Sequence, residues 1–132
     1  MGKIEAINIT NISEENTFYV NQAILEKGKG IVNDRYYENF KEKKEQVTLI
    51  NIEDINNFNI QIKQNIEAKD FRRNIIVSGV NLNELINKKI KIKSRLIKFV
   101  DLRKILLINI EPIKLVTNGA RREKIRKLRI KI

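Results

Sequence analysis

Short apolar runs separated by polar turns recur along the chain, and most of the runs alternate as β-strands do. Within residues 3–10 the apolar positions are Ile4, Ala6, Ile7 and Ile9, close to the two-residue period of a strand with one buried face. The apolar run that stops at Ser78-Gly79 predicts a short buried strand, and comparable runs predict strands over residues 18–25, 46–50, 86–97, 99–102 and 105–110. The last strand is expected to stop at Pro112, because proline has no N–H to donate to a sheet.

Helical patterns are fewer and shorter. Asn51 can cap a helix over residues 52–58, whose first turn carries Glu53 and Asp54, where the helix dipole favours acids. Residues 82–85 predict one further helical turn. Both segments are short, so helices are expected to be a minor part of the fold.

The C-terminal stretch RREKIRKLRIKI fits two structures. Leu128, Ile130 and Ile132 alternate with basic residues as in a strand, whereas Ile125, Leu128 and Ile132 would share one face of a helix. We favour the strand, with lysines that protect an exposed sheet edge. The chain is therefore expected to form a single domain over residues 1–132, mostly β, with a barrel-like, largely antiparallel sheet and a few short helices.

Candidate chemistry is concentrated in residues 70–85, DFRRNIIVSGVNLNEL, where polar side chains lead directly into an apolar strand. Arg72, Arg73 and Asn74 stand at the beginning of that strand. Arginine presents a fork of N–H donors suited to oxyanions, and the neighbouring amide can donate or accept. This end of the strand is thus a candidate anion site. The alternative is a solvated or salt-bridged loop that binds nothing.

A second candidate region covers residues 28–37, GKGIVNDRYY. Two glycines flank Lys29, so the backbone amides of this corner can approach an anion. Asp34, Arg35 and Tyr36 follow, and they place an acid, a guanidinium group and a phenol side by side. Their spacing is compatible with a binding loop and does not require catalysis.

The composition is that of a globular domain with a large basic excess. Hydrophobic residues make up 42% of the 132 residues, and 27 Lys and Arg against 16 Asp and Glu give a net charge of +11. Residues 121–132 hold seven basic side chains and one acid, so they contribute +6 of that charge. Such an excess suits nucleic acid, an anionic membrane surface or a phosphate-bearing ligand. The abundance of Ile, Asn and Lys also fits an AT-biased genome, which would make part of the charge incidental.

The chain contains neither Cys nor His. Thiolate nucleophiles, persulfides, soft-metal sites and imidazole acid–base catalysis are therefore excluded. The N-terminus has no signal-peptide pattern, and no apolar run approaches the length of a membrane span. We expect a cytoplasmic protein without membrane partners.

The order of several motifs resembles the MOSC domain family, the C-terminal domain of molybdenum-cofactor sulfurases, which also occurs as a small stand-alone bacterial protein. The motifs are GKGIVNDRYY, EQVTLI, DFRRNIIVSGVNLNELI, the weaker IKIKSRLIKFVDLR, and NGARRE at residues 118–123. Together they cover most of the chain. The resemblance implies a β-rich barrel, which agrees with the strands expected from the hydrophobic pattern.

The chain also departs from the family pattern. The family's Gly-Asp-Arg is Asn33-Asp34-Arg35 here, and its Cys-x-x-Cys falls on Arg103 and Leu106. A further cysteine of related proteins falls on Arg122. The family is associated with molybdenum and pyridoxal phosphate, and with sulfur transfer through a cysteine persulfide that this chain cannot form.

Without the cysteines, ligand binding is the family property that the resemblance still implies for this chain. It implies a site for an oxyanion or for a molybdenum, pterin-type cofactor, with a molybdoenzyme or sulfur-transfer enzyme as partner. The residues that match basic, amide or flanking positions of the family are Asp34, Arg35, Tyr36, Arg72, Arg73, Asn74 and Arg121. Within this interpretation Asp34 would orient Arg35.

Three other interpretations stay open. The basic residues 88–98 and 124–132 would suit a nucleic-acid-binding protein, although no aromatic residues are interleaved among the basic residues of the tail and no base-reading motif is present. An enzyme could use Asp34, Tyr36 or Lys29 on a phosphorylated substrate. A degenerate paralogue that retains only the fold is the third possibility.

Overall fold

The computed structural model describes residues 2–11, 16–38, 46–86, 88–92, 94–99, 107–112 and 128–131, and strands predominate among them. One sheet has the order β2-β1-β6-β5-β10-β9-β7 and the other has the order β4-β3-β8. The large sheet comprises β1 (Lys3–Ile9), β2 (Phe18–Tyr19), β5 (Val47–Asn51), β6 (Ile75–Ser78), β7 (Lys89–Lys91), β9 (Leu107–Pro112) and β10 (Leu128–Lys131). The small sheet comprises β3 (Ala23–Glu26), β4 (Gly30–Ile31) and β8 (Ile97–Phe99).

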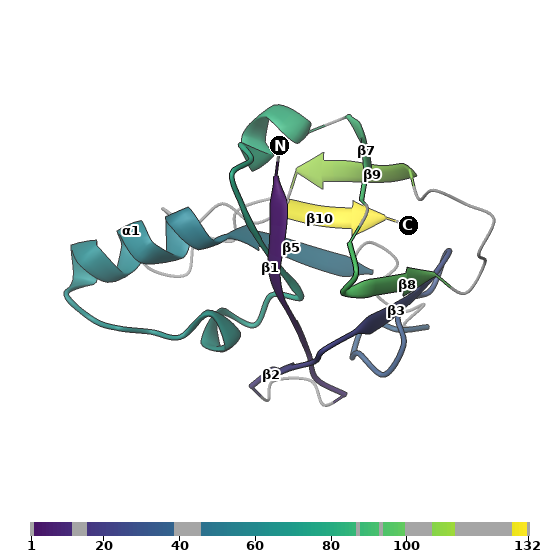
Figure 1. Cartoon of the computed structure of the whole chain (residues 1–132), viewed down its shortest axis with the longest axis horizontal. Helices are drawn as coiled ribbons and strands as arrows, with labels where there is room; N and C mark the ends of the chain where they lie inside the picture. Colours follow the sequence, from purple (N-terminus) through teal and green to yellow (C-terminus); the bar gives the residue numbers. More distant parts are fainter. Residues whose placement is uncertain are drawn as a thin grey trace.

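Both sheets are mixed. Strands β5 and β6 are parallel, as are β3 and β8, whereas the other pairings between described strands are antiparallel. The prediction of a mostly β fold is confirmed. These pairings form two sheets and do not close into a barrel, so the barrel-like closure stays a prediction. In Figure 1 the helix α1 (Ile52–Ile62) extends to one side of the large sheet, and β3 and β8 lie on the other side.

The main core lies on the face of β1 that carries Ile4, Ile7 and Ile9. Strict alternation would put Ile4 and Ile7 on opposite faces, but a β-bulge between Ile4 and Ala6 shifts the register against β6. Ile4 therefore joins the other two in one cluster, and Ala6 packs against a second cluster. Residues from both sheets complete the main cluster, including Ala23, Leu25, Ile31, Val47, Leu49, Ile75, Val77 and Ile97.

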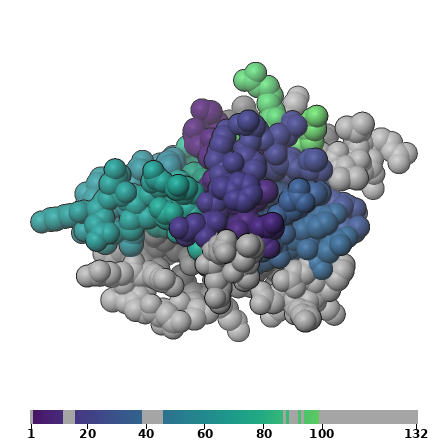
Figure 2. All heavy atoms as spheres, turned by 90° about the horizontal axis from the view of Figure 1, so that it is seen from below, coloured from purple at the N-terminus to yellow at the C-terminus, as the bar shows by residue number. Residues whose placement is uncertain are grey.

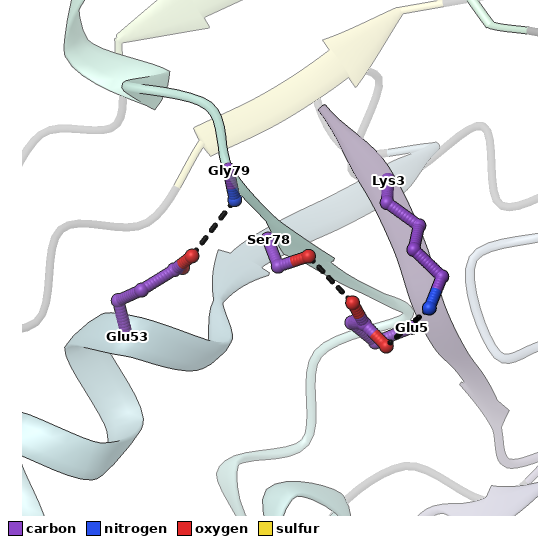
Figure 3. A network of polar contacts seen from close by, with 5 residues as sticks. All are labelled: Lys3, Glu5, Glu53, Ser78 and Gly79. Carbon is purple, nitrogen blue, oxygen red and sulfur yellow. Dashed lines mark hydrogen bonds and ion pairs between the residues drawn. The ribbon is translucent and has the colours of Figure 1, made fainter. Parts of the chain in front are cut away.

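Helix α1 covers the opposite face of the large sheet through Ile55, which packs with Ile50 of β5 and Ile76 of β6. The helix runs past residue 58, where it was expected to end, and stops at Lys63, whose backbone is left-handed. Asn51 is the N-cap residue, but its side chain makes no capping hydrogen bond, contrary to the prediction. Figure 3 shows a different contact in the first turn, in which Glu53 accepts a hydrogen bond from the Gly79 N–H at 2.7 Å.

Two of the predicted strands are divided in the structure. Residues 18–25 form β2 and the first part of β3, because the chain bends after β2 and β3 pairs with β8, where Ala23 N donates at 2.8 Å to the carbonyl of Leu96, the residue before β8. Residues 86–97 yield only the three-residue strand β7 and the beginning of β8. The short buried strand predicted to stop at Ser78-Gly79 is confirmed as β6, whereas Phe71 belongs to the 3-10 helix η2 (Ala68–Phe71). The helical turn η3 (Leu82–Leu85) is confirmed.

The C-terminal strand is confirmed as β10, but its expected place at a sheet edge is wrong. It pairs with β5 on one side and with β9 on the other, so its backbone groups have partners in both directions. Strand β9 includes Pro112 as its last residue, opposite Leu128. Residues 99–102 were predicted to continue the sheet, and all but Phe99 lie outside the described residues.

The close packing of the backbone at Gly30 in β4 leads to a prediction about stability. A Cβ at Gly30 would lie 2.8 Å from the Gln46 carbonyl oxygen, and the backbone there has φ of +109°. We expect Gly30→Ala to lower the free energy of unfolding by roughly 2–4 kcal/mol, because overpacking and a strained backbone act together. Urea denaturation measures this. Gly28→Ala is the matched control: it has φ of +78° but nothing near its Cβ, so about 1 kcal/mol is expected. Equal losses in the two variants would contradict the packing argument.

Candidate functional site

The two candidate regions of the sequence meet at one end of β1. Arg35 N donates to the Thr10 carbonyl at 2.6 Å, and Arg35 Nη2 donates to the Arg72 carbonyl at 2.9 Å. Asn8, close to the same end, donates its N–H to the Asn74 carbonyl at 2.7 Å. The structure therefore brings residues 34–36 and 72–74 together although they are distant in sequence. In Figure 2 the chain from β2 to residue 38, violet to blue, covers much of the face seen, with α1 in teal beside it.

Asp34 is a buried carboxylate that shapes the loop. Only 5% of its surface is exposed, and its two oxygens accept hydrogen bonds from Thr10 N at 3.1 Å and from Tyr36 N at 3.3 Å. Burial raises the pKa of Asp34 above its ordinary value, although these N–H donors, the Arg35 charge and the Asn74 amide oppose the shift. Asp34 thus bonds backbone groups on either side of Arg35 and positions that residue through the loop.

The Arg35 guanidinium is half-buried and held on two sides. Its Cζ lies 4.6 Å from the centroid of the Tyr36 ring, a cation–π contact, and Nη2 also reaches the Tyr36 hydroxyl at 3.3 Å. Its other terminal nitrogen, Nη1, is buried and has no hydrogen-bond partner within the described part of the chain. Arg35 therefore has a fixed position and one unused donor nitrogen.

Arg72 ends the 3-10 helix η2 in a left-handed backbone conformation, with φ of 58°. This conformation lets its N–H donate to the Lys69 carbonyl at 3.1 Å while its own carbonyl accepts from Arg35. The Nε atom of Arg72 is buried and lacks a hydrogen-bond partner among residues that the structure describes. Arg73 is half-buried and has an interaction of its own.

Asn74 has a structural role here. Its side chain is fully buried; Oδ1 accepts from Thr48 N and Thr48 Oγ1 at 3.0 Å each, and Nδ2 donates to the Asn8 carbonyl at 3.1 Å. Asn74 N also donates to Thr48 Oγ1 at 3.0 Å. One amide thus joins β1, β5 and the start of β6.

Lys29 lies apart from this group. Its ammonium pairs with Glu26 and Glu38, at 3.1 Å in both cases, and these carboxylates raise the pKa of Lys29. Tyr37 donates its hydroxyl to Glu26 in the same network. The ammonium is therefore already neutralised by carboxylates. Arg121, the last of the predicted site residues, lies outside the described residues.

Three polar residues of the site did not stand out in the sequence. Asn8, Thr10 and Thr48 are each at most 3% exposed, and all contact the loop or Asn74 through their backbone or side-chain groups. Each interrupts or ends an otherwise apolar strand, which is the signal that could have identified them. Their burial places a group of polar residues in the interior at this end of β1.

The groups that this site offers are hydrogen-bond donors. Two guanidinium groups each keep a buried N–H nitrogen without a protein acceptor among the described residues, and buried donors are costly unless they are paired. No group of three or more Asp and Glu in the described part of the chain could hold a metal ion. Nor does any helix described in the structure have the length and apolar character needed to cross a membrane.

The stability of the loop should depend on pH through Asp34. The pKa of Asp34 in the folded protein is raised above 3.8. Protonated Asp34 therefore adds to the free energy of unfolding, fully below pH 3.8, and this contribution is lost as the pH rises through the folded pKa. We expect wild type to lose stability relative to Asp34→Asn over the range of pH that rises from 3.8 through the raised folded pKa. Urea denaturation of both proteins across that range measures the difference. A constant difference, or one that favours wild type as pH rises, would contradict the raised pKa.

Comparisons of the chain with protein-family models, with curated proteins and with solved structures find no match.

Proposed function

We propose that the chain is a small oxyanion-binding module. The observation that carries the proposal is the pair of buried nitrogens, Arg35 Nη1 and Arg72 Nε, that have no acceptor among the described residues. Both belong to guanidinium groups, and Arg35 is held to the Arg72 carbonyl. An oxyanion at this position would supply the missing acceptors and neutralise the buried charge.

The contribution of the two arginines to anion affinity depends on their burial. Each charge-assisted hydrogen bond contributes roughly 1.5–3 kcal/mol where water is excluded and far less at a surface. The contacts of Arg35 with Tyr36 and with the Arg72 carbonyl fix its guanidinium before a ligand binds. Little side-chain entropy is then lost on binding, which favours affinity.

The ligand class that we propose is a phosphate-bearing or metal-oxyanion cofactor of the molybdenum, pterin type. This choice rests on the resemblance to MOSC domains, and a MOSC-like, barrel-like closure of the whole chain is part of the same proposal. Arg35 and Arg72 would hold the anionic group, and Asp34 would fix the loop that carries Arg35. When bound, the cofactor would supply the metal chemistry. The absence of cysteine removes persulfide formation from this chain.

Calorimetric titration of the full chain tests the proposal. The probes are inorganic phosphate, molybdate, molybdenum cofactor and pyridoxal phosphate, each at low and moderate salt. The account predicts saturable binding of one anion per chain that persists at moderate salt, because a buried pair is screened less than surface charge. Cofactor binding tighter than phosphate binding would favour a pterin-type ligand, and preference for pyridoxal phosphate would favour that cofactor instead.

Failure of all four probes would overturn the proposal. The nucleic-acid alternative then regains priority, since it rests on the net charge of +11 rather than on this site. Most of the basic tail that supports that alternative, residues 121–127, lies outside the described residues. A single-stranded oligonucleotide that binds with a steep salt dependence would be its signature.

A further inference from the structure

A cavity lies toward the other end of β1 and β6 from the arginine site. It has a volume of about 880 Å³ and is bordered by the first residues of β1, the end of β6, η3 and the segment that leads into β8. Its interior is aliphatic. The side chains that define it include Ile4, Val77, Val80, Leu85, Ile92 and Leu96.

This cavity is distinct from the arginine site. Lys3 of β1 is paired with Ser78 of β6 at the cavity end, whereas Ile7 is paired with Ile75 toward the arginine end. Thr10, which contacts the arginine loop, is seven positions beyond Lys3, a span on the order of 20 Å in an extended strand. The residues that border the cavity include neither Arg35 nor Arg72, nor the residues bonded to them, so the two sites have separate linings.

The lining indicates the ligand class. Pockets of a few hundred to about 1,000 Å³ with apolar walls and few polar groups are typical small-molecule sites. Tyr19 is the one aromatic residue among those that border this cavity, so a flat ring would find little to stack against. A flexible hydrocarbon chain fits aliphatic walls better, because burial of methylene groups is non-directional.

The margin of the cavity is suited to an anionic head group. Arg95 is exposed at that margin, and no carboxylate in the described residues pairs with its guanidinium. Glu5 also borders the cavity, but it is already engaged: Lys3 lies 3.3 Å away, and Ser78 Oγ donates to it at 2.5 Å. Figure 3 shows this network, in which Glu5 lies between Lys3 and Ser78. The repulsion that its carboxylate would exert on an anion is thereby reduced.

We propose that this cavity binds a single-chain amphipathic anion of the fatty-acid type, with the hydrocarbon chain among the aliphatic side chains and the head group at Arg95. The proposal is independent of the arginine site and of its ligand. The net charge of +11 favours an anionic head over a cationic one.

Calorimetric titration with sodium dodecanoate tests this inference. We expect saturable binding of one dodecanoate per chain and weaker binding of octanoate, which buries fewer methylene groups. Arg95→Ala should weaken dodecanoate about fivefold and leave dodecan-1-ol nearly unchanged, because an exposed ion pair contributes modestly. Lys98→Ala is the matched control, since Lys98 is exposed nearby but does not border the cavity.

A second variant places a charge within the cavity itself. Leu85→Asp should reduce dodecanoate affinity more than tenfold, since it puts a carboxylate among the aliphatic walls, and circular dichroism verifies that the variant folds. Arg72→Ala should not change dodecanoate affinity, which separates this site from the proposed function. No saturable binding by wild type, or binding that Leu85→Asp leaves intact, would overturn the proposal. A stable dimer that binds no dodecanoate would overturn it as well.

Discussion

The Arg72→Ala variant is expected to lose most of its affinity for phosphate and molybdate while keeping its fold. Removal of the guanidinium takes away one of the two buried donors, a loss of roughly tenfold to hundredfold at 1.5–3 kcal/mol per charge-assisted bond. The variant retains the Arg72 carbonyl that holds Arg35. Calorimetric titration gives the affinity, and circular dichroism gives the fold.

Lys69→Ala is the control for loss of charge at Arg72. Lys69 belongs to the same 3-10 helix, carries the same charge, and is half-exposed in an ion pair with Glu67 at 3.2 Å. Its removal should change anion affinity by less than about threefold, because surface pairs contribute little. If both variants weakened binding equally, general positive charge would explain the affinity, and the buried site would lose its support.

The Asn74→Ala variant is expected to lower the free energy of unfolding by roughly 3 kcal/mol. The substitution leaves Thr48 N and the Asn8 carbonyl without their side-chain partners inside the protein, and each unsatisfied buried group costs about 1–3 kcal/mol. Urea denaturation monitored by circular dichroism measures the change.

Asn57→Ala is the matched control, because Asn57 is exposed on α1. A change within about 0.5 kcal/mol of zero is expected there. A loss of less than about 1 kcal/mol in Asn74→Ala would show that Asn74 does not join the three strands as described. It would also leave Asn74 available for a ligand, as the sequence pattern had suggested.

Local hydrophobic spacing was sufficient to predict β1, β5, β6 and the start of α1, and for β10 it left a choice between a strand and a helix. It was not sufficient where backbone pairing between distant segments decides the outcome. The division of residues 18–25 depends on the pairing of β3 with β8 and on a hydrogen bond from Ala23 to Leu96, and the interior place of β10 depends on β5 and β9. Neither partner is visible in a local pattern, so an edge strand was the simplest interpretation.

In the candidate site, too, local motifs could be identified from the sequence, whereas the role of each residue depends on the folded structure. The motifs around Asp34 and Arg72 each stood out as candidates in the sequence, and the contacts of Arg35 with Thr10 and Arg72 join them in the structure. The individual roles were not predictable, because they follow from burial. The side-chain amide of Asn74 is of a kind that can bind a ligand. Because it is fully buried between strands, its hydrogen bonds are made to Thr48 and Asn8 instead.

Anomalous diffraction from crystals of the full chain soaked in molybdate tests the central claim most directly. The account predicts a molybdenum peak with its oxygens within hydrogen-bond distance of Arg35 Nη1 and Arg72 Nε, roughly 2.7–2.9 Å, and no such peak in Arg72→Ala crystals. Molybdenum bound elsewhere, or both nitrogens paired with protein acceptors and no anion beside them, would contradict it.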